Sequence, residues 1–207
     1  MELLIVRHGE TAWTISGQHT GRTDVPLTER GRTEASALRP VLASLLHGRG
    51  ALVYTSPSRR ARETAALALP AAEVAVDPRL AEYDYGRYEG LTTAEIDRVH
   101  AGWNIWRDGC PGGESTAAAG ARADACLRDL AEADPVPVVV FSHGHFSRIL
   151  AARALGLPPE AGRIFGTATA AVSVVGAYRG EPCITLWNAS AELLEDVERR
   201  AAAPAKR

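Results

Sequence analysis

The chain has 207 residues, enough for one domain with a substantial core. Its hydrophobic fraction of 46%, charged fraction of 23% and net charge of −2 are ordinary for a globular protein and give no reason to expect nucleic acid or an anionic membrane as a partner. No apolar stretch is long enough to span a bilayer and no signal-peptide pattern precedes the first apolar run, so we expect a cytoplasmic protein.

Basic residues and cysteines narrow the chemistry further. Lys206 is the only lysine, and arginine accounts for the other 22 of the 23 basic residues. A Schiff-base or P-loop mechanism therefore has no suitable lysine. Because arginine is so common in this chain, only arginines at motif positions are informative about function. Cys110, Cys126 and Cys183 are odd in number and form no C-x-x-C pair, which disfavours both a disulfide framework and a structural zinc site.

The first apolar run, residues 2–6, predicts a buried strand. Arg7, His8, Gly9 and Glu10 follow it directly. Open α/β sheets bind their ligands beyond the carboxyl ends of strands, so His8 is a candidate nucleophile beside an anion-binding arginine. A polar surface loop would explain this segment equally well if it stood alone.

The same arrangement recurs after the first helix. Residues 28–48 have apolar positions at helical spacing, with Thr28 as N-cap and Gly48 as stop. The apolar run 51–54 then predicts a second buried strand, followed by Thr55-Ser56-Pro57-Ser58-Arg59-Arg60 and a helix over 58–69. A brief strand is expected at 74–76.

The middle of the chain is richer in loops. Residues 79–90 form a loop crowded with charge and tyrosine, and the capping-box pattern Thr92-Thr93-Ala94-Glu95 opens a short helix. The segment 103–113 is expected to be irregular. Trp103 and Trp106 within it fit either a core stripe or the wall of a substrate pocket. An alanine-rich helix is predicted over 115–133.

A third strand, 136–141, is followed by Ser142-His143-Gly144-His145 and a helix over 145–155. Residues 171–178 and 183–187, joined by the Arg179-Gly180 turn, predict an antiparallel hairpin at one edge of the sheet. The last ten residues, 198–207, are expected to be a flexible tail. Residues 1–197 are therefore expected to form a single catalytic domain.

Strands alternate with helices along most of the chain. This pattern predicts an α/β fold, a three-layer αβα domain with a mainly parallel sheet and one antiparallel edge strand. If the three strands are neighbours, their carboxyl ends deliver Arg7, His8, Arg60 and His143 to a common edge.

Such a cluster is suited to phosphoryl chemistry. Arg7 and Arg60 present planar donor forks for a phosphate or carboxylate, His143 adds a third donor, and the Gly144 backbone N–H adds a fourth at the start of a helix. Nearby positive charge disfavours the imidazolium, so His8 should remain neutral and able to attack phosphorus. The arginines supply the positive charge, and no metal or other cofactor is required.

A leaving alkoxide also needs a proton donor. Glu10 competes for this role with the carboxylates of the tyrosine-rich loop. We favour Glu82, because a loop from another part of the chain can reach over the substrate, and partial burial against tyrosine suits a general acid. Asp84 and Glu89 are expected to be solvated loop charges.

Other uses of these residues are open. His8, His143 and His145 could ligate a metal, with Glu10 or Asp24 completing a hydrolase site. The chain lacks both an H-E-x-x-H motif and an aspartate-rich cluster. A histidine buried for packing would explain any one of these residues, but not the repeated placement at strand ends.

The motifs closely resemble the histidine phosphatase superfamily, the phosphoglycerate-mutase-like group. The resemblance runs in order from residue 2 to about 155 and covers six motifs: 7–11, 20–28, 56–65 with the motif arginine at Arg60, 82–86 with 89–90, 113–115, and 142–144. It implies a phosphohistidine at His8, a phosphate pocket of Arg7, Arg60 and His143, and Glu82 as acid and base.

The resemblance also implies substrate contacts from Thr20, Gly21 and Tyr85. Thr14 stands where the family usually carries an asparagine that contacts the phosphate. We expect a weakened or altered contact there and retained activity.

The stretch 91–111 is short and not basic, whereas cofactor-dependent mutases of the family carry a long basic insertion at this place. This favours hydrolysis over mutase-type phosphoryl transfer. The segments 103–110 and 142–145 are similar to fungal sedoheptulose-1,7-bisphosphatases, which implies a sugar phosphate or bisphosphate substrate, with Arg107 contacting a distal phosphate. A non-catalytic sensor of phosphorylated ligands is a further alternative, although its sign would be loss of His8 or Glu82. Oligomeric state, including a homo-oligomer, stays open.

Overall fold

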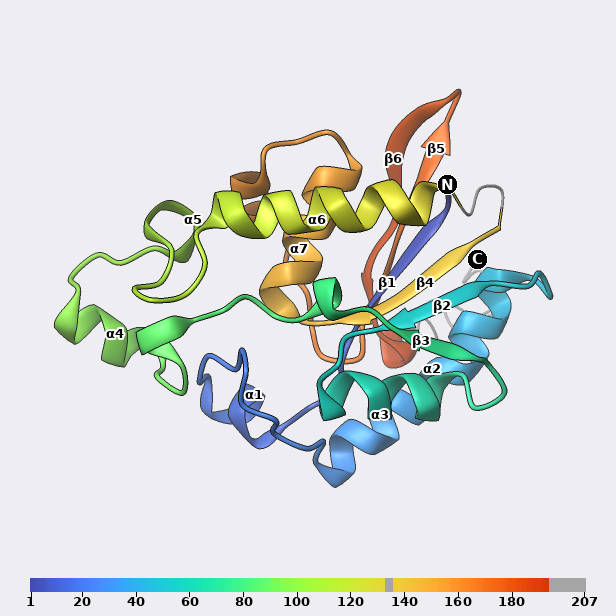
Figure 1. The fold of residues 1–207 in the computed structure, drawn as a ribbon. Coiled ribbons are helices and arrows are strands. Elements are labelled where there is room, and N and C mark those ends of the chain that lie inside the picture. Colours follow the sequence, from blue (N-terminus) through green and yellow to red (C-terminus); the bar gives the residue numbers. More distant parts are fainter. Residues whose placement is uncertain (133–135, 194–207) are drawn as a thin grey trace, which may run out of the picture.

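A computed structural model describes residues 1–132 and 136–193. Its centre is a six-stranded sheet in the order β3-β2-β4-β1-β5-β6 (Figure 1). The strands are β1 (Leu3–Arg7), β2 (Leu52–Thr55), β3 (Val74–Val76), β4 (Val138–Ser142), β5 (Val172–Tyr178) and β6 (Glu181–Ala189). Strands β1 to β4 pair in parallel. The predicted mainly parallel sheet is confirmed.

Four longer helices cover the two faces of the sheet. The lower layer in Figure 1 is formed by α2 (Glu29–Leu46) and α3 (Arg59–Ala68), the upper layer by α6 (Thr116–Ala131) and α7 (Gly144–Ala154). Strand β1 supplies both cores, because successive side chains point to opposite faces. Leu3 and Ile5 pack with α6 and α7, while Leu4 and Val6 pack with α2 and α3. This explains why the strand is apolar throughout and not alternating.

The hairpin of β5 and β6 confirms the predicted antiparallel edge. Strand β5 runs against β1, and β6 lies outside β5. The edge strand itself is therefore β6, and the strand antiparallel to β1 is its inner neighbour. Arg179 and Gly180 both have positive φ angles, 52° and 87°, as a tight two-residue hairpin turn requires.

Two short helices, α4 (Thr93–Val99) and α5 (Ile105–Asp108), lie at the left end of the molecule in Figure 1, and α1 (Ala12–Ser16) lies lower in the same view. Three 3₁₀ turns are η1 (Pro78–Leu80), η2 (Gly86–Tyr88) and η3 (Pro159–Ile164). The predicted capping box of Thr92 and Glu95 is present. Helices α1 and η3 were not predicted, and α5 interrupts a segment expected to be irregular.

The topology places three loops side by side. Because β4 lies between β2 and β1, the residues that follow these strands meet at the carboxyl edge of the sheet. The loop after β1 also packs closely on the first turn of α2. A Cβ atom on Gly31 would overlap the backbone of Glu10, so only glycine permits this approach.

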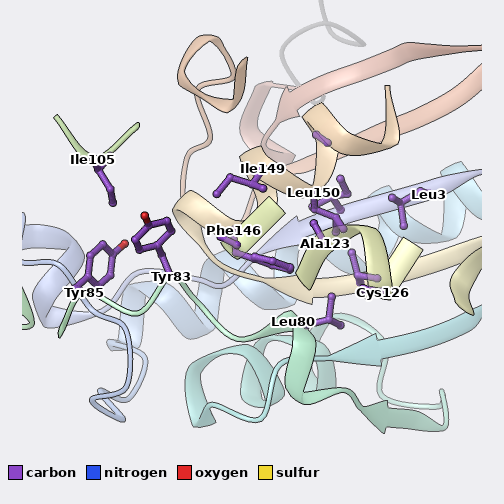
Figure 2. Packing of buried hydrophobic residues seen from close by; sticks show 14 of the residues in the cluster. Leu3, Leu80, Tyr83, Tyr85, Ile105, Ala123, Cys126, Phe146, Ile149 and Leu150 are labelled. Carbon is purple, nitrogen blue, oxygen red and sulfur yellow. The ribbon is translucent and has the colours of Figure 1, made fainter. Parts of the chain in front are cut away.

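One core cluster reaches from the sheet toward this edge. Figure 2 shows Phe146, Ile149 and Leu150 of α7 on one side and Tyr83 with Tyr85 at the far end. The tyrosine-rich loop is therefore anchored in part by burial of its tyrosines. Every helix within residues 1–132 and 136–193 is too short or too polar to cross a bilayer. The predicted tail, 198–207, lies outside the described residues.

Candidate active site

His8 stands directly after β1 and is 4% exposed. Its Nδ1 atom lies 2.7 Å from the carbonyl oxygen of Gly9. A carbonyl only accepts hydrogen bonds, so Nδ1 carries the proton and Nε2 keeps a free lone pair. Burial, followed by the charges of Arg60 and Arg7, holds the pKa of His8 well below 6.5. The imidazole is therefore neutral and nucleophilic at neutral pH.

Two arginines flank this imidazole, the partly exposed Arg7 and the buried Arg60. Arg7 donates from Nη1 to the carbonyl of Thr167 at 2.6 Å. Arg60, at the first turn of α3, is fully buried and binds the backbone of segment 20–23. Its acceptors are Thr23 O from Nη1 at 3.0 Å, and Thr20 O and Gly21 O from Nη2 at 2.9 and 3.2 Å. Backbone carbonyls thus fix the guanidinium without neutralising it.

His143 follows β4 and faces His8, with the two ring centroids 5.3 Å apart. Its Nε2 atom lies 2.7 Å from the hydroxyl of Ser56 and 3.3 Å from that of Ser58, both in the loop after β2. Burial and the charge of Arg60 lower the pKa of His143 well below 6.5, so the ring holds one proton. In the tautomer in which a serine hydroxyl donates to Nε2, the ring proton is on Nδ1.

Three buried nitrogen atoms of this cluster have no hydrogen-bond partner within the described residues: Arg7 Nε, Arg60 Nε and His143 Nδ1. Buried donors are almost always satisfied in folded proteins. Gly144 adds space beside them, since a Cβ atom there would lie 3.4 Å from Arg7 Cζ. The set is suited to an anion that accepts several hydrogen bonds at once.

Glu82 reaches the same place from the loop after η1 and is 9% exposed. Its carboxylate caps helix α7, whose own N-cap residue, His143, makes no side-chain capping bond. Oε1 accepts from the N–H of Phe146 at 2.8 Å and of Tyr83 at 2.8 Å, and Oε2 accepts from His145 N–H at 3.1 Å. The helix terminus therefore fixes this carboxyl group beside the anion site.

A cavity of about 210 Å³ opens beside Arg7, His8 and Glu82, whereas Arg60 and His143 do not line it. Arg7, His8, Glu82 and Gly144 form its floor, and a wall of larger side chains surrounds the entrance. The wall consists of Trp13, Thr14, Gln18, His19, Thr20, Tyr85, His145, Arg148 and Thr167. Glu82 also lines a second cavity of about 530 Å³, which His143 borders from its own side, so Glu82 lies between two spaces.

Polar aromatic side chains dominate the wall. Burial raises the pKa of Tyr85 well above 10, so its hydroxyl keeps the proton and donates to His145 Nδ1 at 2.7 Å. Burial lowers the pKa of His145 well below 6.5, which leaves a neutral ring with its proton on Nε2. His19 packs on Tyr85 at 4.8 Å between ring centroids.

Arg148 lies one turn after His145 on α7 and was not predicted from the sequence. Its guanidinium stacks on Trp106 at 4.5 Å, and Nε and Nη2 donate to the carbonyls of Gly162 and Arg163, both at 2.9 Å. These contacts orient a cation at the cavity wall. Trp106 supports it from behind, and Trp103 is buried with its indole N–H on Gly109 O. Neither tryptophan lines the cavity.

The structure does not bring Arg107 to this cavity. Its guanidinium is exposed and bonds Asp108 at 2.6 Å and the carbonyl of Gly102 at 2.8 Å. The predicted contact with a distal phosphate has no support in this position. Thr14 does line the cavity, but its hydroxyl donates to Thr11 O at 2.8 Å and accepts from Thr11 N–H. Its single hydroxyl proton is therefore already engaged.

The competing carboxylates have other partners. Glu10 accepts from the hydroxyl of Thr28 at 2.7 Å and so ties the loop after β1 to the start of α2. Asp84 pairs with the exposed Arg22 at 2.6 Å. Glu89 accepts backbone N–H groups of segment 20–23. The expectation that Asp84 and Glu89 are only solvated charges is wrong, because both carboxylates are held by specific donors.

A metal site would require His, Cys, Asp or Glu side chains that point toward a common centre. Within residues 1–132 and 136–193, no group of three or more His, Cys, Asp or Glu side chains is arranged to hold a metal ion. His8, His143 and His145 direct ring nitrogens at Gly9, Ser56 and Tyr85 instead. The arrangement is suited to binding a tetrahedral anion and attacking it with an imidazole nitrogen.

Known proteins share this sequence and fold. The profile of the histidine phosphatase superfamily (branch 1) matches residues 3–190. An acid phosphatase of Mycobacterium tuberculosis is 43% identical over 86% of this chain and 87% of its own. The sedoheptulose 1,7-bisphosphatase of Saccharomyces cerevisiae is 40% identical over 74% of this chain and 67% of its own. A solved structure from Mycobacterium tuberculosis, the product of an open reading frame, superimposes with a TM-score of 0.87 at 40% identity, covering 92% of this chain and 98% of that one.

Proposed function

The chain belongs to the histidine phosphatase superfamily, and from this membership and the site geometry we propose that it is a metal-independent phosphatase of small phosphorylated metabolites. One observation carries the proposal: His8 presents a free Nε2 lone pair among buried arginine and histidine nitrogen atoms that have no hydrogen-bond partner within residues 1–132 and 136–193. A nucleophile and an anion site coincide there. Phosphatases among the relatives support the same conclusion.

The first half-reaction forms a phosphohistidine. Arg7, Arg60 and His143 hold the phosphoryl oxygens, and His8 Nε2 attacks phosphorus as the ester P–O bond breaks. Glu82, in its acid form, gives its proton to the departing oxygen. The two arginine side chains stabilise the negative charge that spreads over the phosphoryl oxygens in the transition state.

The second half-reaction consumes water. The Glu82 carboxylate takes a proton from a water molecule whose oxygen attacks phosphorus, and the N–P bond breaks. His8 returns to its neutral state and Glu82 to its acid form. The sum is phosphomonoester plus water giving alcohol plus inorganic phosphate.

The proposal places the whole reaction in one domain, residues 1–197, without cofactor, nucleic acid or membrane, in the cytoplasm. Hydrolysis is favoured over mutase activity because the stretch 91–111 lacks a long basic insertion. A sensor without activity would need neither a nucleophile nor an acid, and this chain keeps both His8 and Glu82.

We further propose a sugar phosphate or sugar bisphosphate as substrate. The yeast relative is named for sedoheptulose 1,7-bisphosphate. In this chain the cavity wall offers His19, Tyr85 and His145 for ring and hydroxyl contacts, and Arg148 for a second anionic group. Arg148 takes the role that the sequence analysis gave to Arg107.

A phosphatase screen tests the function. Incubated with sugar monophosphates and bisphosphates, including sedoheptulose and fructose bisphosphates, the protein should release inorganic phosphate at the same rate with and without EDTA. Loss of activity in EDTA would contradict a metal-independent mechanism. Isomerised product with little free phosphate would show a mutase, and no turnover of any substrate would favour the sensor.

Substitution of Arg148 tests the substrate class. Arg148→Gln should raise KM for a sugar bisphosphate about tenfold, because a hydrogen-bonded ion pair with the distal phosphate is lost. KM for the corresponding monophosphate should stay within about twofold of wild type by the same reasoning. Arg107→Gln is the matched control and should change neither value. Equal effects of Arg148→Gln on both substrates would contradict a distal-phosphate contact.

A further inference from the structure

Glu89 touches neither cavity, yet it is bonded to the loop that holds a site arginine. Both of its carboxylate oxygens lie 3.0 Å from the N–H of Gly21, and Oε1 also accepts from Thr23 N–H at 3.0 Å. The carbonyls of this same segment, 20–23, accept from Arg60. The segment therefore faces Glu89 with its N–H groups and Arg60 with its carbonyls.

From this arrangement we infer that Glu89 is a positioning residue, which acts through segment 20–23 to hold the Arg60 guanidinium in place for the phosphoryl group. Three of the guanidinium's N–H donors go to these carbonyls, and its buried Nε has no partner among the described residues. The direction of the unpartnered donor depends on where the carbonyls stand. Their position depends in turn on the amides bound by Glu89.

The surrounding contacts leave the segment little freedom to move once Glu89 binds it. A Cβ atom on Gly21 would lie 2.7 Å from Tyr83 O and 2.8 Å from Glu89 Oε2, so the chain passes closely between them. On the other side of Glu89, Gly90 N–H donates to His19 O at 2.9 Å, and His19 N–H donates to Leu91 O at 2.9 Å. Backbone hydrogen bonds thus join His19 to residues 90–91, and the Glu89 carboxylate fixes the neighbouring segment 20–23, which binds Arg60.

Electrostatics alone predict the opposite effect of removing this charge. Glu89 is one of the anions whose charge raises the pKa of Arg60 against the lowering effect of burial. Neutralising it makes the pocket more positive, and a more positive pocket binds anions more tightly. A positioning role instead predicts weaker anion binding, because the guanidinium loses its orientation. The sign of the change in anion affinity therefore distinguishes a purely electrostatic role of Glu89 from a positioning role.

Orthovanadate binding, measured by calorimetry, provides the test without requiring turnover. Glu89→Gln keeps the shape of the side chain but loses the charge and one of its two acceptors, and should weaken vanadate binding about tenfold. In an Arg60→Ala background the same substitution should change binding less than about twofold, because no guanidinium remains to be positioned. KM for substrate should rise with the vanadate dissociation constant in Glu89→Gln.

Asp84→Asn is the matched control. This substitution removes a carboxylate from the same loop as Glu89, but the Asp84 carboxylate binds the exposed side chain of Arg22 and the N–H of Gly86. It should leave vanadate affinity unchanged or slightly increased. Unchanged or tighter binding in Glu89→Gln would overturn the inference. An equal loss in both Arg60 backgrounds would do so as well, since the effect would then not pass through Arg60.

This inference rests on the proposed function only in requiring an anion site. If the wild-type protein binds no vanadate, the proposed phosphatase site itself is wrong. If the wild type binds vanadate and the two backgrounds fail to differ, only the role of Glu89 is wrong.

Discussion

Replacing His8 by alanine should lower kcat by at least about 10⁴-fold, because the proposed acceptor of the phosphoryl group is removed and water must attack the ester directly. Brief incubation with a ³²P-labelled substrate followed by acid-free quenching should label the wild-type protein and leave His8→Ala unlabelled. Vanadate should still bind the variant, since Arg7, Arg60 and His143 remain. Loss of activity with retained binding identifies a nucleophile and not a binding residue.

The exposed His47 offers a control for this experiment. His47 ends α2 in a left-handed conformation with φ of 50°, which asparagine tolerates, so His47→Asn should keep full labelling and activity. Wild-type labelling should also persist as the pH falls through 6.5. Burial lowers the pKa of His8, so the ring remains neutral below the pH at which an ordinary histidine gains its proton. Labelling of His8→Ala at the wild-type rate would contradict the phosphohistidine mechanism.

The fold was predictable because burial leaves a periodic pattern. Strand β1 packs on helices at both faces, so its sequence is apolar without interruption, and the spacing of Leu38, Val41 and Leu42 in α2 reflects one buried helix face. Helix α1 left no such pattern. It has five residues and none of them is buried, and its N-terminus depends on mutual hydrogen bonds between Thr11 and Thr14.

The centre of the site was predictable for a topological reason. Arg7 ends a strand, His8, Arg60 and His143 follow strands closely, and parallel neighbouring strands end at one edge. The backbone alone brings these residues together. Sequence position sufficed to group them, while their hydrogen bonds, such as that between His143 and Ser56, required the structure.

Residues farther from strand ends were harder to assign, as the two arginines Arg107 and Arg148 show. Arginine is common in this chain, so neither was distinguished by type. Arg107 turns to its neighbour Asp108, whereas Arg148 shares a helix face with His145 three positions earlier. The three-residue spacing of His145 and Arg148 in the predicted helix was the only sequence feature that could have pointed to Arg148. Glu89 shows the same limit, because its backbone partners lie about seventy positions away in the chain.

Glu82→Gln should separate the capping of α7 by this residue from its proposed role as proton donor. The amide keeps an acceptor for the N–H groups of Tyr83 and Phe146, so the fold should be preserved. It cannot donate a proton as an acid can. For an alkyl phosphate, whose leaving oxygen is strongly basic, kcat/KM should fall about 10²- to 10⁴-fold.

For p-nitrophenyl phosphate the same substitution should have a much smaller effect on kcat/KM, because the phenolate leaves without protonation. The second half-reaction still needs Glu82 to deprotonate water, so the phosphohistidine should accumulate and p-nitrophenol should appear as a burst before a slow steady rate. Wild-type protein, with both steps assisted, should show no comparable accumulation. Equal losses of kcat/KM on both substrates would mean that Glu82 does not protonate the leaving group. Its carboxylate would then only cap the N-terminus of α7.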